Sequence, residues 1–424
     1  MGNLDYTQVL NKIENTRRFG NEPGVVVTAQ VIKVLREKGK QKRIIPYIHV
    51  AGTNGKGSVC AFFSSILKKE HMRVGTFVSP HLVDFEERIT VDGRMISKAD
   101  VTRLGNYLLD IDFGIGLTMF DYCLAMALLY FEEQQCDYMV IETGLGGRLD
   151  STNAIGTPQC AVITKIGYDH MAILGSDIAD IAAEKAGIIK ENGTVVVEQQ
   201  DKRAMQVIEQ EAKKKHARII TVEQSDIARC SGYALRLCGT FQWENAAAAE
   251  LAARYVLGKR YSGPGYEMQY DKTEPKSEKT DLNDRIKSAL EEAVWPGRME
   301  IVSKEPFLLV DGAHNSNGVD ALKESLMQMY PGEKFCFFMG VMADKDYDVM
   351  IREILPLAEE FYTVTPDSDR ALQASHLADF IRKEGVCATE LSGVDEIRKH
   401  LKRDTKNVAF GSLYFIGELK QHRI

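Results

Sequence analysis

Short apolar runs alternate with amphipathic segments between residues 45 and 200. Five runs predict β-strands: IPYIHVAG, VGTFVS, DYMVIET, CAVITKI and GTVVVE. Two segments between them, SVCAFFSSILKKE and TMFDYCLAMALLYFEE, have the apolar spacing of helices. Because apolar strands bracketed by helices are buried on both faces, this pattern predicts a parallel sheet with helices packed on each side.

The same alternation begins again near residue 299. PFLLVDGAHN, KFCFFMGV, FYTVTP and NVAFGS predict strands, and residues 319–329 and LADFIRKEG predict helices. The first 40 residues have a helical pattern, interrupted by a Gly- and Pro-containing loop at 20–24. The second half is therefore expected to form a further α/β domain.

These patterns predict an α/β chain of two domains. We expect a P-loop-containing, parallel-sheet ATPase domain over residues 1–294 and a smaller, Rossmann-like C-terminal α/β domain over residues 299–424. WPGR at 295–298 is expected to be the linker between them. Residues 259–284 are polar and lack apolar periodicity, which predicts a long surface insertion.

Composition narrows the class of protein. The chain has 424 residues, 44% of them hydrophobic and 27% charged, with a net charge of −7. This composition argues against a disordered chain, and the acidic balance argues against nucleic-acid binding through phosphate neutralisation. The most apolar window, residues 117–131, is shorter than the ~18 residues of a membrane span and contains Asp121. Eight cysteines without a C-x-x-C motif predict reduced thiols in a cytosol.

The segment GTNGKGS, at residues 52–58, is the strongest local signal for chemistry. It lies between a predicted strand and a predicted helix, so its backbone N–H groups, the helix N-terminus and Lys56 could together hold a polyphosphate. It departs from the strict G-x-x-x-x-G-K-[ST] motif, because Val50 replaces the first glycine and Gly57 follows the lysine. The alternative is a glycine-rich turn without a ligand.

Three polar residues follow other predicted strands. Ser79, Glu142 and His170 stand at or just beyond strand ends, where ligands bind in open parallel sheets. A hydroxyl, a carboxylate and an imidazole beside phosphates could hold Mg²⁺. Taken singly, a strand-end serine is usually a cap and a loop histidine usually a surface residue, but their joint occurrence after a phosphate loop favours a metal site.

The segment GLGGRLDSTN, at residues 144–153, has two possible interpretations. It resembles a dinucleotide fingerprint but lacks the third glycine, and a better phosphate loop lies upstream. The favoured interpretation is a tight loop that lets Arg148 and Asp150 approach an organic substrate.

Two further positions stay open on residue chemistry alone. Lys185, in AEKAGIIK, is either a solvated helix lysine or a partly buried amine of lowered pKa that takes up CO₂ as a carbamate. Asp311 in DGAHN could bind a ribose, and Arg298 in WPGR is either a linker charge or a phosphate contact.

Taken together, the motifs resemble one known family. HVAGTNGKGSV, SPHLVDFEERI, IETGLGGRLDSTN, KIGYDHMAILG, AEKAGIIK, WPGRME, DGAHN and GSLYFIGE occur in an order similar to the folylpolyglutamate synthase/dihydrofolate synthase family, a branch of the Mur ligase superfamily. The resemblance implies a cytoplasmic ligase that uses ATP to join L-glutamate to the carboxylate of a folate or of dihydropteroate, through an acyl phosphate. It also implies the small molecules ATP, glutamate and folate or dihydropteroate as partners. We expect a monomer without nucleic-acid or membrane partners.

The resemblance also assigns residues. The residues expected to bind ATP are Gly52, Thr53, Asn54, Gly55, Lys56, Gly57, Ser58, Asn245, Arg298, Asp311 and His314. Of these, the resemblance assigns 55–58, Asn245, Arg298 and Asp311. It implies two Mg²⁺ ions on Ser79, Glu142 and His170, a monovalent cation, and a carbamylated Lys185. The residues expected to act in catalysis are Lys56, Glu142, His170 and Lys185. Those expected to bind the substrate are Ser79, His81, Asp121, Arg148, Leu149 and Asp150.

Departures from the family pattern concern the folate pocket. Asp121 stands where the family more often has Glu, and VVVTA follows Pro23-Gly24 in place of the expected Leu-x-Arg. We therefore expect polyglutamylation of tetrahydrofolate together with weaker use of dihydropteroate. The alternatives are a monofunctional folylpolyglutamate synthase, another Mur-type amino-acid ligase, and a nucleotide-binding module without catalysis. About 45 residues precede the phosphate loop, too few for the uridine-nucleotide domain of a cell-wall ligase.

Overall fold

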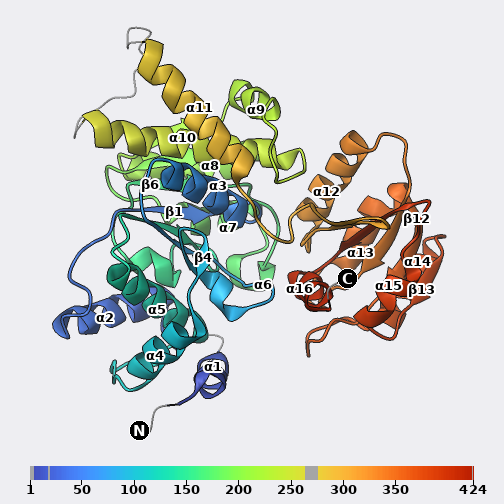
Figure 1. Cartoon of the computed structure of the whole chain (residues 1–424), viewed down its shortest axis with the longest axis horizontal. Helices are drawn as coiled ribbons and strands as arrows, with labels where there is room; N and C mark the ends of the chain where they lie inside the picture. The colour runs from blue at the N-terminus through green and yellow to red at the C-terminus, as the bar shows by residue number, and fades with distance from the viewer. Residues whose placement is uncertain (1–3, 18–19, 263–275, 423) are drawn as a thin grey trace. The chain divides into compact units, whose positions relative to one another are not determined.

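The computed structural model describes residues 4–17, 20–262, 276–422 and 424, which form two compact units (Figure 1). Unit 1 comprises Met1–Ala234 and Glu244–Ala293, and unit 2 comprises Leu235–Trp243 and Val294–Ile424. The short segment 235–243 thus joins the later part of the chain. It does so because Phe241 packs against the core of unit 2 and Thr240 N donates to Ser325 Oγ over 3.0 Å.

Unit 1 is built on an eight-stranded sheet of order β4-β3-β2-β5-β1-β6-β7-β8. Its strands are β1 (Tyr47–Ala51), β2 (Val74–Phe77), β3 (Ile89–Val91), β4 (Arg94–Met95), β5 (Tyr138–Glu142), β6 (Cys160–Ile163), β7 (Thr194–Val197) and β8 (Arg218–Thr221). The six strands from β2 to β8 in this order are parallel, and β3 and β4 add an antiparallel edge. The five strands expected from the apolar runs are confirmed, whereas β3, β4 and β8 were not expected because they are short and partly exposed.

Helices cover both faces of this sheet, as expected for buried parallel strands (Figure 1). One face packs on α1 (Tyr6–Glu14), α2 (Gly24–Glu37), α4 (Lys98–Leu109), α5 (Met119–Glu133), α7 (Ile178–Ala186) and α8 (Lys202–Lys214). The other face packs on α3 (Lys56–Lys69) and α10 (Phe241–Ser262), and α11 (Lys276–Glu292) packs on α3. Short elements complete the unit: η1 (Phe85–Arg88), η2 (Ser151–Ala154), α6 (Met171–Leu174) and α9 (Gln224–Ser231).

The expected insertion over residues 259–284 is helical at both ends. Helix α10 continues to Ser262 and α11 begins at Lys276, while 263–275 lies outside the described residues. The helical ends, 259–262 and 276–284, were not predicted, and the expectation of a surface insertion stays a prediction. The buried side chains of α11 include Ile286 and Leu290. Arg285 on this helix donates to the nearly buried Glu70 over 2.6 Å.

Unit 2 has a six-stranded sheet of order β13-β12-β11-β14-β10-β9. Its strands are β9 (Glu300–Lys304), β10 (Phe307–Val310), β11 (Phe335–Met339), β12 (Ala358–Thr363), β13 (Ala388–Glu390) and β14 (Lys406–Phe410), all parallel except β9. Its helical elements are α12 (Ser316–Met329), α13 (Tyr347–Ile354), η3 (Leu355–Leu357), α14 (Ala374–Lys383), η4 (Val394–Glu396), α15 (Ile397–His400) and α16 (Leu413–Gln421). Buried aromatic rings such as Phe337, Phe361 and Phe410 fill the core between sheet and helices.

Candidate active site

The predicted phosphate loop lies at the carboxyl edge of the parallel strands of unit 1. It connects β1 to α3, and β1 is flanked by β5 and β6 in the sheet. Loops that follow neighbouring parallel strands meet at one edge, so the segments after β2, β5 and β6 are brought to the phosphate loop. The expected grouping of these loops follows from the strand order, which the sequence alone did not specify.

The loop backbone is held in place by the segment after β6. Thr53 N and Asn54 N both donate to the carbonyl oxygen of Lys165, over 2.9 and 3.2 Å, and Thr164 Oγ1 donates to Asn54 O over 2.6 Å. Gly55 has a φ of 89°, and a Cβ there would lie 2.3 Å from Asn245 Oδ1. A glycine is therefore required at the residue that precedes α3. The amide groups of the first helical turn have no partner within the helix, which suits an anion.

Lys56, the first residue of α3, folds back over this loop. Its Nζ donates to the carbonyl oxygens of Gly52 and Thr53, over 3.2 Å each, and lies 3.8 Å from Glu142 Oε1. Glu142 is the last residue of β5 and is almost fully buried. The lysine predicted to bind phosphate and the carboxylate predicted to bind Mg²⁺ thus form an ion pair at the strand ends.

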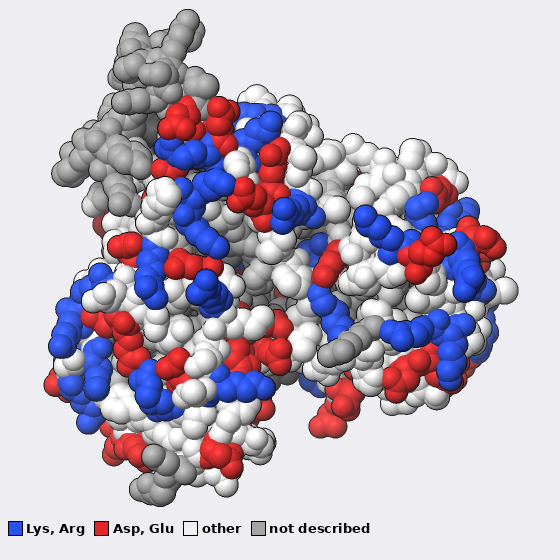
Figure 2. Space-filling model, viewed as in Figure 1, with Lys and Arg blue, Asp and Glu red and all other residues white. Residues whose placement is uncertain are grey.

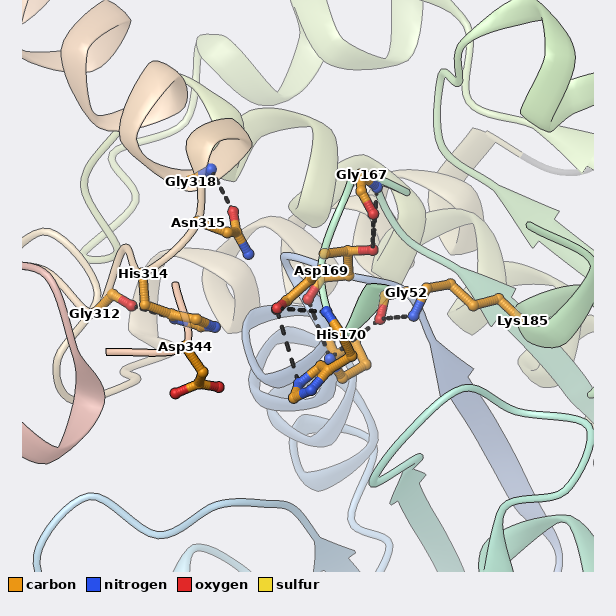
Figure 3. A network of polar contacts seen from close by, with 12 residues as sticks. Gly52, Gly167, Asp169, His170, Lys185, Gly312, His314, Asn315, Gly318 and Asp344 are labelled. Atoms are coloured by element: carbon orange, nitrogen blue, oxygen red, sulfur yellow. Dashed lines mark hydrogen bonds and ion pairs between the residues drawn. The ribbon is translucent and has the colours of Figure 1, made fainter. Parts of the chain in front are cut away.

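The two other predicted metal ligands have different surroundings. Ser79 follows β2, and its backbone N donates to Glu142 Oε2 over 3.2 Å. His170 caps α6 in a left-handed conformation with a φ of 52°, and its Nε2 lies 3.9 Å from Asp169 Oδ2 (Figure 3). Within the described ranges, no cluster of three or more His, Cys, Asp or Glu side chains is suited to hold a metal ion. The predicted set contains only two residues of those types, so its ability to bind a metal stays a prediction.

Lys185 is buried in α7, and its Nζ donates to Gly52 O over 2.8 Å (Figure 3). Burial, and after it the charge of Lys56, lowers the pKa of this amine to about 7. The sequence left two interpretations of Lys185 open, and the structure excludes the solvated one.

The segment after β5 forms the tight loop that the sequence predicted. Asp150 accepts four hydrogen bonds inside it, and burial raises the pKa of this carboxyl above its ordinary value. The Arg148 guanidinium turns toward α7, where its Nη2 donates to Ala183 O over 2.9 Å. Only Leu149, 52% exposed, leaves most of its side chain accessible. Asp150 and Arg148 therefore shape this loop, and their direct contact with a substrate stays a prediction.

Asp121 has a structural function that the sequence analysis did not anticipate. It closes a capping box at the start of α5, where Oδ2 accepts from Thr118 N over 2.8 Å. Its Oδ1 accepts from Ser151 Oγ over 2.6 Å, and the side chain is buried. Both carboxylate oxygens are thus engaged within the protein.

His81 is also engaged within the protein. Its Nδ1 accepts a hydrogen bond from Arg88 Nε over 2.8 Å. Burial and the charge of Arg88 lower the pKa of His81 to about 4, so the imidazole is neutral at physiological pH.

The predicted site residues of unit 2 lie around the loop after β10. Asp311 is buried and accepts from Met299 N and Ala313 N, over 2.8 Å each. His314 Nδ1 lies 2.8 Å from Gly312 O, and Asn315 caps α12 by accepting from Gly318 N over 2.8 Å (Figure 3). A Cβ on Gly312 would lie 2.0 Å from Arg298 Nη1, so the guanidinium lies directly over this glycine. The structure thus brings Arg298, Asp311 and His314 together within unit 2.

Two buried residues of the site were missed by sequence reasoning. His49 in β1 lies 2.7 Å from Thr152 Oγ1 in η2 through its Nε2. The available signal was a histidine inside an otherwise apolar strand, which requires a polar partner when it is buried. The partner could not be identified because 103 residues separate the two positions.

The visible face of the molecule carries charges of both signs. Figure 2 shows Lys and Arg interspersed with Asp and Glu over the visible face, without a continuous basic stripe. None of the helices in the described part of the chain is long and apolar enough to cross a membrane. All eight cysteines are free.

Comparison with known proteins identifies similar sequences and structures over nearly the whole chain. Residues 50–253 match the Mur ligase middle domain, and residues 297–411 match the Mur ligase glutamate ligase domain. A dihydrofolate synthase/folylpolyglutamate synthase of Bacillus subtilis is 33% identical, over 98% of each chain. The structure of Mycobacterium tuberculosis folylpolyglutamate synthase complexed with ADP and AMPPCP superposes with a TM-score of 0.83 at 25% identity, over 99% of each chain. E. coli FolC in complex with DHPP and ADP gives 0.80 at 26% identity, over 99% of this chain and 97% of that one.

Proposed function

Because this chain belongs to the dihydrofolate synthase/folylpolyglutamate synthase family, we propose that it is an ATP-dependent ligase that adds L-glutamate to folates and to dihydropteroate. The bond formed is an amide between a carboxylate of the acceptor and the amine of glutamate. The names of the B. subtilis relative and of the E. coli complex with DHPP and ADP support both acceptors. We assign the ATPase chemistry to residues 1–294 and glutamate ligation to a domain over residues 299–424.

One observation carries the proposal: the ion pair of Lys56 and Glu142 at the phosphate loop, over 3.8 Å. It places a positive charge and a buried carboxylate at the carboxyl ends of two adjacent parallel strands. An enzyme that activates a carboxylate with ATP needs both, one to bind the γ-phosphate and the other to hold a divalent cation. A glycine-rich turn without a ligand would need neither group.

The chemistry follows from the poor reactivity of carboxylates toward amines. Transfer of the γ-phosphoryl group to the acceptor carboxylate gives an acyl phosphate, whose phosphate is a good leaving group. The glutamate amine then attacks the acyl carbon, loses a proton and releases phosphate. Lys56 and the first turn of α3 would stabilise the charge on the transferred phosphoryl oxygens. Arg298, Asp311 and Asn245 are proposed to contact the nucleotide.

Two of the three predicted metal ligands carry the oxygen donors that Mg²⁺ prefers. Glu142 offers a buried carboxylate and Ser79 a hydroxyl, while His170 would add an imidazole nitrogen. We propose that these residues hold two ions, which neutralise phosphate charge when bound. Lys56 at present compensates the charge of Glu142, and its Nζ would be free to turn to a phosphate once a cation takes that place.

Lys185 is proposed to react with CO₂ to form a carbamate. Its neutral amine forms an N–C bond to CO₂ and loses one proton, which leaves an anionic side chain. The pKa of about 7 makes a large neutral fraction available at physiological pH. The remaining N–H of the carbamate could still donate to Gly52 O, so the modification is compatible with the observed contact. The carbamate would then counter the charge of Lys56.

We further propose that the protein works in the cytoplasm as a monomer, with a monovalent cation as an additional cofactor. The function is tested by ADP release from ATP with tetrahydrofolate or dihydropteroate, each with and without L-glutamate. The expected result is release that requires both the acceptor and glutamate, with the glutamylated product seen by mass spectrometry. Release with tetrahydrofolate but not dihydropteroate would indicate a monofunctional folylpolyglutamate synthase. Release with neither acceptor would contradict the proposal.

A further inference from the structure

Two fully buried polar side chains, His49 and Thr152, have no part in the proposed chemistry. They form a chain of hydrogen bonds that ends on Asp150. His49 Nε2 lies 2.7 Å from Thr152 Oγ1, and Thr152 Oγ1 donates in turn to Asp150 Oδ1. Burying polar side chains costs folding free energy unless they are hydrogen-bonded, so this series of buried hydrogen bonds needs an explanation.

The contacts of Asp150 determine which group donates and which accepts in each hydrogen bond of this series. Its Oδ2 accepts from Gly144 N and Leu145 N, over 3.0 and 2.9 Å, and its Oδ1 accepts from Thr152 N over 3.0 Å. Three backbone N–H donors favour the ionised form of Asp150, which can only accept, so the Thr152 hydroxyl gives it its single proton. Thr152 Oγ1 must then accept from His49, which places the imidazole proton on Nε2.

The other ring nitrogen agrees with this assignment. His49 Nδ1 is buried and has no hydrogen-bond partner among the described residues, which suits a bare nitrogen better than an N–H group. Burial lowers the pKa of His49 to about 3, so the ring is neutral. A neutral ring with its proton on Nε2 is the form that can donate to Thr152.

The series of hydrogen bonds from His49 through Thr152 to Asp150, called the relay below, connects the two loops of the candidate site. His49 lies in β1, three residues before Gly52 of the phosphate loop. Asp150 is the last residue of the segment that begins at Gly144, two residues after Glu142. Its carboxylate accepts hydrogen bonds from the first two amide groups of that segment. That segment carries Leu149, the most exposed of its predicted substrate contacts. The relay therefore fixes the substrate loop relative to the strand that leads to the phosphate loop.

We propose that His49 and Thr152 are positioning residues for the acceptor substrate: through Asp150 they hold the loop of residues 144–150 in the shape that receives the folate or pteroate acid. This inference rests on the proposed function. It assigns the two residues to acceptor binding and leaves ATP binding to the phosphate loop.

Matched pairs of variants separate the hydrogen bonds from the space the side chains fill. Thr152→Val removes the hydroxyl, whereas Thr152→Ser keeps it. His49→Leu removes the donor, whereas His49→Gln keeps an N–H near the position of Nε2. We expect Thr152→Val and His49→Leu to raise the KM for the acceptor about tenfold or more, with the KM for ATP nearly unchanged. Thr152→Ser and His49→Gln should restore most of the acceptor affinity. Equal losses for both members of each pair, or equal changes for ATP and acceptor, would overturn the proposal.

A second readout does not depend on activity. Nitrogen NMR of the imidazole groups should show His49 neutral with its proton on Nε2, and amide exchange at Gly144 and Leu145 should be faster in Thr152→Val than in Thr152→Ser. A proton on Nδ1, or unchanged amide exchange in Thr152→Val, would overturn the relay even in an active enzyme. An intact relay in a protein that turns over neither acceptor would instead contradict the proposed function.

Discussion

Lys56 and Lys185 donate hydrogen bonds to the same acceptor, the carbonyl oxygen of Gly52, over 3.2 and 2.8 Å. Two amines at one carbonyl repel each other when both are charged, and two features of the structure reduce this repulsion. Lys56 lies 3.8 Å from Glu142, while Lys185 is buried with a pKa of about 7. The first carbonyl of the phosphate loop therefore orients two lysines. Lys56 is charged, and Lys185 is present in both charged and neutral forms near pH 7.

Lys56→Ala is expected to lower folate- and glutamate-dependent ADP release by a factor of about 10³ or more, because the transferred phosphoryl group loses its positive partner. The midpoint of thermal unfolding should change little, since among the described residues Lys56 Nζ contacts two loop carbonyls and Glu142. Lys69→Ala is the matched control on the same helix, where the lysine pairs with the exposed Glu292. Wild-type turnover of Lys56→Ala would falsify the assignment of the phosphate loop.

Glu142→Ala is expected to reduce activity more than His170→Ala, by about a hundredfold against about tenfold. Glu142 is buried beside Lys56 and Ser79, whereas the His170 ring is partly exposed at the start of α6. Both variants should need more Mg²⁺ for half-maximal activity, as measured by titration of ADP release. If the two losses were equal and the Mg²⁺ dependence unchanged, neither residue would be a metal ligand.

Asp121→Glu tests the departure from the family pattern. From the sequence, restoring Glu should improve use of dihydropteroate alone. The capping contacts of Asp121 lead us to expect a different result: an added methylene in this buried box lowers stability by about 1–3 kcal/mol and affects both acceptors alike. Thermal unfolding and kcat/KM for the two acceptors decide between these two expected results. A selective gain with dihydropteroate would restore the pterin-contact interpretation.

Carbamylation of Lys185 is expected to depend on pH with a midpoint near the pKa of about 7. The amine must be neutral to attack CO₂, so the carbamate should increase as pH rises through 7 at constant dissolved CO₂. Carbon NMR with labelled CO₂ measures it directly, and the signal should be absent in Lys185→Arg. Activity of Lys185→Ala should be partly rescued by small carboxylates. A signal that persists in Lys185→Arg would place the modification at another amine.

The neutral His49 ring predicts a pH dependence of folding stability. In the folded protein the pKa of His49 is about 3, below the ordinary value of 6.5, so between these values the unfolded chain binds a proton that the folded chain does not. The stability is fully present above pH 6.5 and is lost as pH falls, at up to about 1.4 kcal/mol per pH unit. Denaturant unfolding of His49→Gln should show a shallower slope over this range. Equal slopes would mean that His49 titrates normally.

Much of the architecture of both units follows from local pattern. The apolar runs around Val50, Val140 and Val162 are long enough to be read as buried strands without any knowledge of their partners. Helix α11 was not predictable in this way, because it packs on α3 and its Arg285 pairs with Glu70, contacts that lie far away along the chain. Such tertiary contacts can outweigh a weak local helix signal.

For the candidate site, too, one part followed from the sequence and another from the tertiary structure. By itself the sequence determined which chemical groups are present: the glycines and Lys56 of the phosphate loop, Glu142 at a strand end, and a tight loop after it. Only the tertiary structure decided how they are used. Asp121 caps a helix, Asp150 organises its own loop and Lys185 is buried against Gly52. The reason is physical: burial and hydrogen-bond partners set the charge and orientation of a side chain, and both come from residues such as Thr152 that lie far away along the chain.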